Sequence, residues 1–452
     1  METELYQQKG AALLARLNRI PAWALPKNFL VIIGLGYFFT FYDISNIGFA
    51  MPAINEQFHL SNSTSLFLAL SVGLIGYIIG SFVIGTLADR FGRYKMLILT
   101  FALTAVGSFG DALAPDITTL IIFRFLTGVG VGADLNLVST YISELAPTSR
   151  RGRITLLTFL IGILGQTITP FVALALVPNY IIGWRLLFAI GGFIAVAGLI
   201  LRVRLPESPR WEVHHGRMES AEKTIALMET NCTNRHIELP APDLNKVNFI
   251  QAMPIRLLLK PTYLRRLIIL ICMWFLWYIG NYGFLGDAAD LITAQGTGMG
   301  SSIAYLAVGA IGYPLGTLLV LRIVDRIERK TLIFLTTVVW LAGMLLVGSY
   351  AGIYALYSGS FLASLALGSY LQVAYTYTAE VFPTQARATG FALSDGLGHA
   401  GGALGAILLP VIISHTSFFT GFAFIGLTGL LAGIIALAGP KTTGIDLEKV
   451  SS

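Results

Sequence analysis

The chain has 452 residues, of which 55% are hydrophobic and only 12% are charged, and its mean hydropathy is +0.74. A soluble globular domain carries about 25% charged residues, so this composition excludes a soluble protein and predicts a polytopic membrane protein. The formal net charge is +6. We interpret this excess as a consequence of membrane topology and not as a sign of nucleic-acid binding.

The first segment, residues 1–27, is polar and basic and is expected to be a cytosolic tail. It lacks the apolar core of a cleavable signal peptide. Within it, the sequence leaves two interpretations open for Ala11–Ile20. This stretch either lies on the inner membrane surface as an amphipathic turn or two, or belongs to a disordered tail.

Twelve apolar runs follow, each close to the ~20 residues needed to cross the hydrocarbon core of a bilayer. They predict an all-α membrane protein with twelve transmembrane helices in two pseudo-symmetric six-helix bundles, residues 28–201 and 264–438. The runs lie near 28–51, 66–88, 95–113, 117–143, 155–177 and 184–201, and near 264–286, 301–322, 331–349, 355–379, 390–413 and 418–438.

A long polar segment, residues 202–263, joins the two sets. It contains Pro206–Trp211 (PESPRW), a helical pattern over Met218–Glu229 and a helix-breaking stretch over Glu238–Asp243. We expect a cytosolic linker with short helices here, and a cytosolic tail over 439–452.

The distribution of basic residues predicts the orientation. If the N-terminus is cytoplasmic, the inner segments contain 28 of the 30 Lys and Arg residues. Because cytoplasmic loops carry an excess of these residues, we expect both termini on the cytoplasmic side of the plasma membrane.

Two stretches of the chain repeat each other at an offset of 236 positions, as Asp89 and Asp325 illustrate. In a membrane protein, parallel repeats of this size predict an alternating-access transporter with its site between the halves. We expect the repeated charges to form an inner gate, made by Asp89, Arg93, Glu144 and Arg151 in the first half and by Asp325, Glu380 and Arg387 in the second.

Several motifs resemble the major facilitator superfamily. Gly85–Lys95 is similar to its signature between helices two and three, and Pro206–Trp211 matches the segment after helix six of the sugar-porter and metabolite:proton-symporter branches. Tyr375–Thr384 most resembles the metabolite branch. The resemblance implies a transporter rather than an enzyme, with no cofactor. Helix seven lacks the paired glutamines of hexose porters, and the acid of phosphate porters falls on Tyr278.

Ionisable residues inside the bilayer are candidate functional residues because burying a charge in hydrocarbon is costly. Asp43 and Arg124 fall at overlapping depths and are expected to pair, either as a static ion pair or as a proton switch. In the branches that the chain resembles, the matching acid and arginine serve proton coupling. Asp134 is expected to be unpaired, because no basic residue lies near it in helix four. It is either a second proton carrier or a protonated, hydrogen-bonded side chain.

Asp395 and His399 are four residues apart on helix eleven. This spacing allows a hydrogen-bonded pair, and a structural role near the inner gate is the favoured interpretation.

Polar and aromatic side chains on paired helices of both halves mark the expected substrate site. On helix seven, the residues at positions 274, 278, 281 and 282 share one face at helical spacing. The predicted substrate-binding residues are Gln166, Trp277, Tyr278, Asn281, Tyr282, Gln372 and Tyr375.

Together these features predict a secondary active transporter that moves a small organic metabolite with protons by alternating access. An organic or aromatic carboxylate is the favoured substrate class. The alternatives are a phosphate or sugar:proton symporter, an uncoupled facilitator and a drug exporter. The expected partners are the small-molecule substrate, protons and the lipid bilayer, with a monomeric protein and no nucleic acid. No cluster of ligands suggests a metal site.

Overall fold

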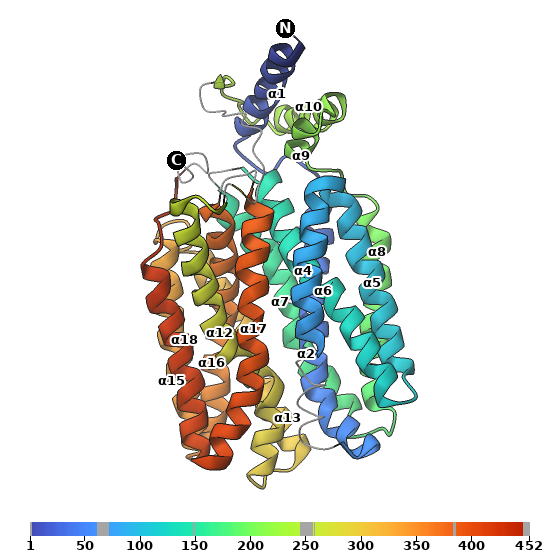
Figure 1. Ribbon diagram of the computed structural model, residues 1–452, viewed down its shortest axis with the longest axis vertical. Helices are drawn as coiled ribbons and strands as arrows, with labels where there is room; N and C mark the ends of the chain where they lie inside the picture. Colours follow the sequence, from blue (N-terminus) through green and yellow to red (C-terminus); the bar gives the residue numbers. More distant parts are fainter. Residues whose placement is uncertain are drawn as a thin grey trace.

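The computed structural model describes residues 2–60, 72–147, 150–244, 256, 258–382 and 386–445. Every regular element in these ranges is a helix. Two bundles lie side by side (Figure 1). The first contains α2 (Lys27–Phe58), α4 (Val72–Phe91), α5 (Arg93–Leu113), α6 (Ile117–Leu145), α7 (Arg151–Leu176) and α8 (Gly183–Arg202). The second contains α12 (Pro261–Ala294), α13 (Met299–Gly309), α14 (Gly312–Leu321), α15 (Arg329–Ser349), α16 (Ile353–Val381), α17 (Arg387–His415) and α18 (Phe418–Leu437).

Eleven of the described helical segments are long and apolar enough to cross a membrane, with α13 and α14 counted as one span. The 29-residue α16 is long enough but more polar, because Ser, Tyr, Thr and Gln side chains interrupt its apolar residues. It runs alongside the other helices of the second bundle (Figure 1). The predicted all-α membrane class is therefore confirmed. The predicted helix over 301–322 differs in one respect, since turn residues 310 and 311 divide it.

Three helices lie at one end of the molecule, which we call the capped face (Figure 1). They are α1 (Glu2–Asn18), α9 (Pro209–His214) and α10 (Met218–Asn234). The structure contradicts the interpretation of this segment as a disordered tail, because α1 is helical and packs on α9 and α10. Its Arg16 and its neighbour Arg19 each form an ion pair with Glu229 of α10, at 2.7 and 2.6 Å. These contacts hold the segment on the linker.

The two bundles repeat the same local interactions at the capped face. Glu207 accepts a hydrogen bond from the backbone N–H of Arg93 at the start of α5 (2.9 Å). Thr443, 236 positions later, accepts one from the backbone N–H of Arg329 at the start of α15 (3.1 Å). Both contacts satisfy an N–H that would otherwise lack a partner at a helix start. The repeat in the sequence thus corresponds to a repeat in the structure.

Glycines allow α17 to pack against α12 at very short distance. A Cβ atom at Gly401 or at Gly405 would lie 2.1 Å from a carbonyl oxygen of α12. Small residues at such positions let membrane helices approach closely. This approach brings the polar residues of α17 against the aromatic residues of α12.

Candidate transport site and gates

A small cavity lies between the two bundles, and we call it the central cavity. Helices α2, α6 and α7 of the first bundle and α12 and α16 of the second provide its walls. Its lining residues are Phe41, Ile44, Leu135, Gln166, Tyr278, Asn281, Tyr282, Leu285, Leu371 and Tyr375. Five of the seven predicted substrate-binding residues are among them: Gln166, Tyr278, Asn281, Tyr282 and Tyr375.

The other two predicted residues are not among the lining residues. The Trp277 indole stacks on the Tyr370 ring, with centroids 3.6 Å apart, and lies 5.2 Å from the Trp340 ring inside the second bundle. The Gln372 side-chain amide donates to the carbonyl of Gly368, one turn earlier on α16. Trp277 does not line the central cavity because neighbouring residues on a helix point about 100° apart. Its side chain therefore cannot share the direction of Tyr278, which does line the cavity.

Two amide side chains reach the central cavity from opposite bundles. The Gln166 Oε1 and Asn281 Oδ1 atoms are buried and have no hydrogen-bond partner among the described residues. A buried acceptor without a partner costs about 1–3 kcal/mol. A ligand hydroxyl or N–H would remove this cost. A rotation of 180° about the last side-chain bond exchanges the positions of the amide oxygen and nitrogen. Either amide can therefore also present its NH2 group to a carboxylate.

A second space adjoins the first on the side away from the capped face, and we call it the outer cavity. It shares Gln166 and Leu285 with the central cavity, and Tyr313 of α14 and Ser45 of α2 also line it. Because α2 begins at the capped face, Ser45 lies further from that face than Phe41. The two cavities therefore follow one another along the interface between the bundles.

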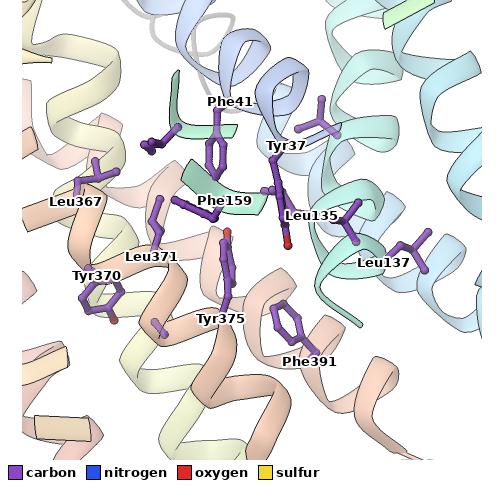
Figure 2. Packing of buried hydrophobic residues seen from close by; sticks show 14 of the residues in the cluster. Tyr37, Phe41, Leu135, Leu137, Phe159, Leu367, Tyr370, Leu371, Tyr375 and Phe391 are labelled. Carbon is purple, nitrogen blue, oxygen red and sulfur yellow. The ribbon is translucent and has the colours of Figure 1, made fainter. Parts of the chain in front are cut away.

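Aromatic rings fill the interface on the other side of the central cavity. Phe41 and Phe159 of the first bundle meet Tyr375 and Phe391 of the second (Figure 2). The ring centroids are 5.0 Å apart for Phe41 and Phe159, and 6.5 Å apart for Phe159 and Tyr375. Tyr375 and Phe391 follow at 5.6 Å. These rings lie between the central cavity and the capped face, where α7 and α17 begin.

The predicted pair of Asp43 and Arg124 is present and has a third member. An Arg124 guanidinium nitrogen lies 3.5 Å from Asp43 Oδ2, and the other lies 3.3 Å from Oδ2 of Asp111 on α5. All three side chains are buried. If both acids are ionised, the group carries one net negative charge in a low-dielectric interior.

Sequence reasoning missed Asp111, although a signal was present. This acid lies two residues before the outer end of the predicted span 95–113, and Arg124 lies seven residues after the outer end of the next span, 117–143. Consecutive spans run in opposite directions, so two residues near the same membrane surface are close in depth.

Asp134 is not unpaired, so that expectation was wrong. Arg202, at the end of α8, donates to both of its carboxylate oxygens, with Nη2 3.0 Å from Oδ2. Thr40 and Thr100 donate to the same carboxylate at 3.2 and 3.0 Å. The guanidinium also lies over the Phe101 ring, 3.8 Å from its centroid. The partner was missed because Arg202 is 68 positions away and was counted with the linker.

The predicted gate charges form two equivalent clusters at the capped face. In the first bundle, Arg93 lies 3.0 Å from both Asp89 and Glu144. In the second, the equivalent Arg329 lies 3.1 Å from Asp325 and 3.5 Å from Glu380. The predicted Arg387 donates through Nε to the carbonyl of Ala379 (2.8 Å), whereas the Arg151 side chain lies outside the described residues.

The two clusters also touch the opposite bundle. Thr389 of α17 donates to Asp89 Oδ2 (3.2 Å). A Cβ atom at Gly152 of α7 would lie 2.5 Å from Asp325 Oδ1. The bundles are therefore in contact at the capped face.

The PESPRW segment ties the linker to the first cluster. Trp211 donates through its indole N–H to the carbonyl of Asp89 (2.8 Å), and Arg210 donates to the carbonyl of Glu144 (3.2 Å). Burial raises the pKa of Glu207 above its ordinary value, although the backbone hydrogen bonds at the start of α5 lower it in part. A displacement of the linker would thus be transmitted to the gate residues.

These features define a class of protein. Two related helical bundles, a cavity between them and charge clusters at one face are the architecture of an alternating-access membrane transporter. The chain belongs to the sugar (and other) transporter family, whose model matches residues 28–452. It is therefore a transporter and not an enzyme.

Individual relatives span nearly the whole chain. "Putative metabolite transport protein YyaJ" of Bacillus subtilis (strain 168) is 31% identical and covers 94% of this chain and 95% of its own. The niacin transporter NiaP of Acinetobacter baylyi is 28% identical, with coverages of 97% and 99%. The arabinose-proton symporter of Bacillus subtilis is 27% identical, with coverages of 92% and 92%.

A solved structure has the same fold. The proton:xylose symporter XylE, of the major facilitator superfamily, was solved with 6-bromo-6-deoxy-D-glucose and superimposes with a TM-score of 0.78 at 23% identity. The alignment covers 93% of this chain and 97% of that one. The major facilitator fold expected from the sequence motifs is confirmed.

Proposed function

We propose that the protein is a proton-coupled symporter of a small organic metabolite. Its two bundles, residues 28–201 and 264–438, move relative to each other around the central cavity, and the linker 202–263 joins them. It works as a monomer in the plasma membrane, with the capped face in the cytoplasm. The observation that carries the proposal is the buried group of one arginine and two acids formed by Asp43, Arg124 and Asp111.

The physical argument starts from charge balance. A buried ion pair tolerates the membrane interior because its charges compensate, whereas an extra charge there is costly. Two acids on one arginine exceed that balance by one charge, so the group can bind a proton. When Asp43 is protonated, Arg124 keeps Asp111 as its partner. The bond between α2 and α6 is then weakened without leaving the arginine unpaired.

The position of Asp43 links this event to the substrate site. Its neighbour Ile44 lines the central cavity, and Ser45 lines the outer cavity. A shift of α2 after protonation would therefore change the wall of both spaces. This connection supports coupling between proton binding and substrate access.

We propose an organic carboxylate with an aromatic ring as the substrate class. The rings of Phe41, Tyr278, Tyr282 and Tyr375 provide stacking surfaces in the central cavity, and the NH2 group of a side-chain amide such as Asn281 can donate to a carboxylate. A related protein is named as a niacin transporter, and niacin has this chemistry.

A sugar is the second candidate. The buried oxygens of Gln166 and Asn281, as assigned, lack donors in the part of the chain that the structure describes, and sugar hydroxyls would supply them. Relatives named as arabinose-proton symporter and D-xylose transporter handle such molecules.

Uptake into proteoliposomes with an imposed pH gradient tests the coupling. Asp43→Asn can still accept a hydrogen bond but cannot titrate, so we expect it to keep substrate binding and counterflow exchange while losing uphill accumulation. Full gradient-driven accumulation by this variant would remove Asp43 as the coupling residue.

Thermal shift of the purified protein tests the substrate class. The panel contains nicotinate, benzoate, xylose, glucose and phosphate. Stabilisation by the aromatic acids and not by the sugars is the expected result. Stabilisation by sugars alone would replace the first candidate by the second.

A further inference from the structure

One buried carboxylate joins the two bundles. Asp395 lies on α17 of the second bundle and is fully buried. Tyr77, on α4 of the first bundle, donates its hydroxyl to Asp395 Oδ2 (2.7 Å). Tyr278, on α12 of the second bundle, donates to Oδ1 (2.6 Å). The acid is thus a direct hydrogen-bonded bridge across the interface.

The surroundings of this carboxylate are aromatic and contain no fixed cation in the described part of the chain. His399 stacks on Tyr77 at 3.6 Å and lies 3.9 Å from the Tyr278 ring centroid. Its Nδ1 is 2.7 Å from the Asp395 carbonyl but 3.7 Å from the carboxylate. Tyr282 and Tyr375 are the other titratable groups that face the site, from α12 and α16.

This arrangement sets Asp395 apart from the other buried acids in the described membrane-spanning helices. Asp43, Asp134 and Glu144 each have an arginine within ion-pair distance, whereas the described partners of the Asp395 carboxylate are two phenols and one imidazole. An ionised carboxylate without a counter-charge is costly in such an interior. The two tyrosine hydrogen bonds are the only direct compensation in the described residues.

We propose that the Asp395 carboxyl is a second proton-binding site, which links occupancy of the central cavity to contact between the bundles. The proposal rests on the proposed proton-coupled transport. Tyr278 is the connecting residue, since it lines the central cavity and its hydroxyl contacts both Asp395 and the Tyr375 hydroxyl (3.3 Å).

The chemistry follows from counting donors. An ionised Asp395 accepts from both tyrosines at once. When a proton binds, an O–H bond forms at one carboxylate oxygen, and that oxygen becomes a donor. The tyrosine at that oxygen must then turn its hydroxyl and accept, so a charge-assisted hydrogen bond is replaced by a weaker neutral one. At Tyr77 this weakening loosens the bundles, whereas at Tyr278 it frees the hydroxyl hydrogen for the substrate.

The same proton would favour an anionic substrate. An ionised Asp395 lies one tyrosine hydroxyl away from the central cavity and repels a carboxylate there. A neutral Asp395 does not. Substrate and proton would therefore enter together, which is the requirement for symport.

The repeat provides a matched control for Tyr77. Tyr313 lies 236 positions later, on α14 of the second bundle, and lines the outer cavity beside Gln166 of the first bundle. It is a tyrosine at the equivalent place in the interface, but it faces an amide instead of a carboxylate. Tyr313→Phe should therefore leave proton-dependent behaviour intact.

The experiment measures opening at the capped face. Ala392 is buried on α17, and its Cβ lies 3.4 Å from the position of a Cβ at Gly85 of α4. In a background with Cys232→Ser and Cys272→Ser, Ala392→Cys reports separation of these helices through its rate of reaction with a membrane-impermeant maleimide in inside-out vesicles. The rate is measured at several pH values.

We expect the labelling rate, divided at each pH by the rate of a free thiol because only the thiolate reacts, to rise at low pH in the background protein. Asp395→Asn and Tyr77→Phe should each label about tenfold faster at high pH and lose most of the pH response. Tyr77→Phe removes one oxygen atom only, so it decides the question if Asp395→Asn does not fold. A pH response unchanged in both variants, or lost equally in Tyr313→Phe, would overturn the proposal.

Asp43→Asn separates this proposal from the proposed function. If Asp395 is the second site, the labelling of Ala392→Cys keeps its pH response when Asp43 cannot titrate. If Asp43→Asn abolishes the response and Asp395→Asn retains it, the second site is excluded while proton coupling through Asp43 stands. If the pH response of labelling is lost in Asp395→Asn but uptake by the native protein is not driven by a pH gradient, the proposed function is wrong and the proton site at Asp395 remains.

Discussion

The ion pair between Asp134 and Arg202 allows the most direct test of how this interior tolerates charge. We expect Arg202→Met to destabilise the protein strongly, because it leaves a buried carboxylate whose remaining donors among the described residues are the hydroxyls of Thr40 and Thr100. Removing one member of a buried ion pair costs about 3–5 kcal/mol. The lost contact with the Phe101 ring adds to this, since a desolvated cation–π contact contributes about 2 kcal/mol.

The double variant Asp134→Asn with Arg202→Met should recover most of the loss, because replacing both charges removes the uncompensated one. The assay is thermal unfolding of the purified protein in detergent, with the order of midpoints as the readout. The expected order is wild type, then the double variant, then Arg202→Met. A midpoint for Arg202→Met equal to that of the wild type would refute the reasoning, and so would a double variant that is less stable than Arg202→Met.

Three further predictions concern the site, the gate and the cap. Asn281→Ala should weaken substrate binding about 5- to 150-fold, corresponding to about 1–3 kcal/mol, whereas Trp277→Ala should lower the thermal midpoint more than the affinity. Isothermal titration calorimetry and thermal unfolding separate these effects, and wild-type affinity in Asn281→Ala would contradict the first. Replacing Glu144 and Glu380 together by Gln should increase thiol labelling at the capped face. Glu219→Gln is the control, because Glu219 belongs to an exposed ion pair with Lys223. Equal labelling in the double variant and in the control would contradict the gate assignment. Burial raises the pKa of Glu229, but the hydrogen bonds from Arg16 and Arg19 outweigh it and leave that pKa below its ordinary value of 4.5. The contribution of Glu229 to docking of α1 is therefore present above pH ~4.5 and lost as the pH falls through the lowered pKa, so limited proteolysis between α1 and α2 should accelerate in acid and, at neutral pH, in Glu229→Gln.

Some contacts could be predicted from the sequence because membrane depth constrains them. Asp43 and Arg124 are charged residues at overlapping depth in apolar helices, and a charge there needs a partner. Other positions were less constrained. Asp134 was expected to be unpaired because no basic residue lies near it in helix four, although Arg202 pairs with it, and Trp277 was assigned to the substrate wall as an aromatic residue of helix seven, whereas that indole packs inside the second bundle.

The direction of a side chain around its helix explains these errors. Apolar composition defines which segments span the membrane, but lipid-facing and protein-facing positions are both apolar, so the hydrophobic pattern indicates direction only weakly. The partners of Asp395 illustrate the same limit, because Tyr77 is 318 positions away and belongs to the other bundle.

The sequence by itself determined the membrane class, the two related halves, the superfamily and the gate motifs, since length, composition and a repeated polar pattern are properties of the chain alone. Only the tertiary structure decided which acids share an arginine, which amides meet in the central cavity and which carboxylate joins the bundles. The reason is physical: hydrogen bonds and ion pairs act over about 3–4 Å, and helix packing alone brings residues from distant parts of the chain within that distance.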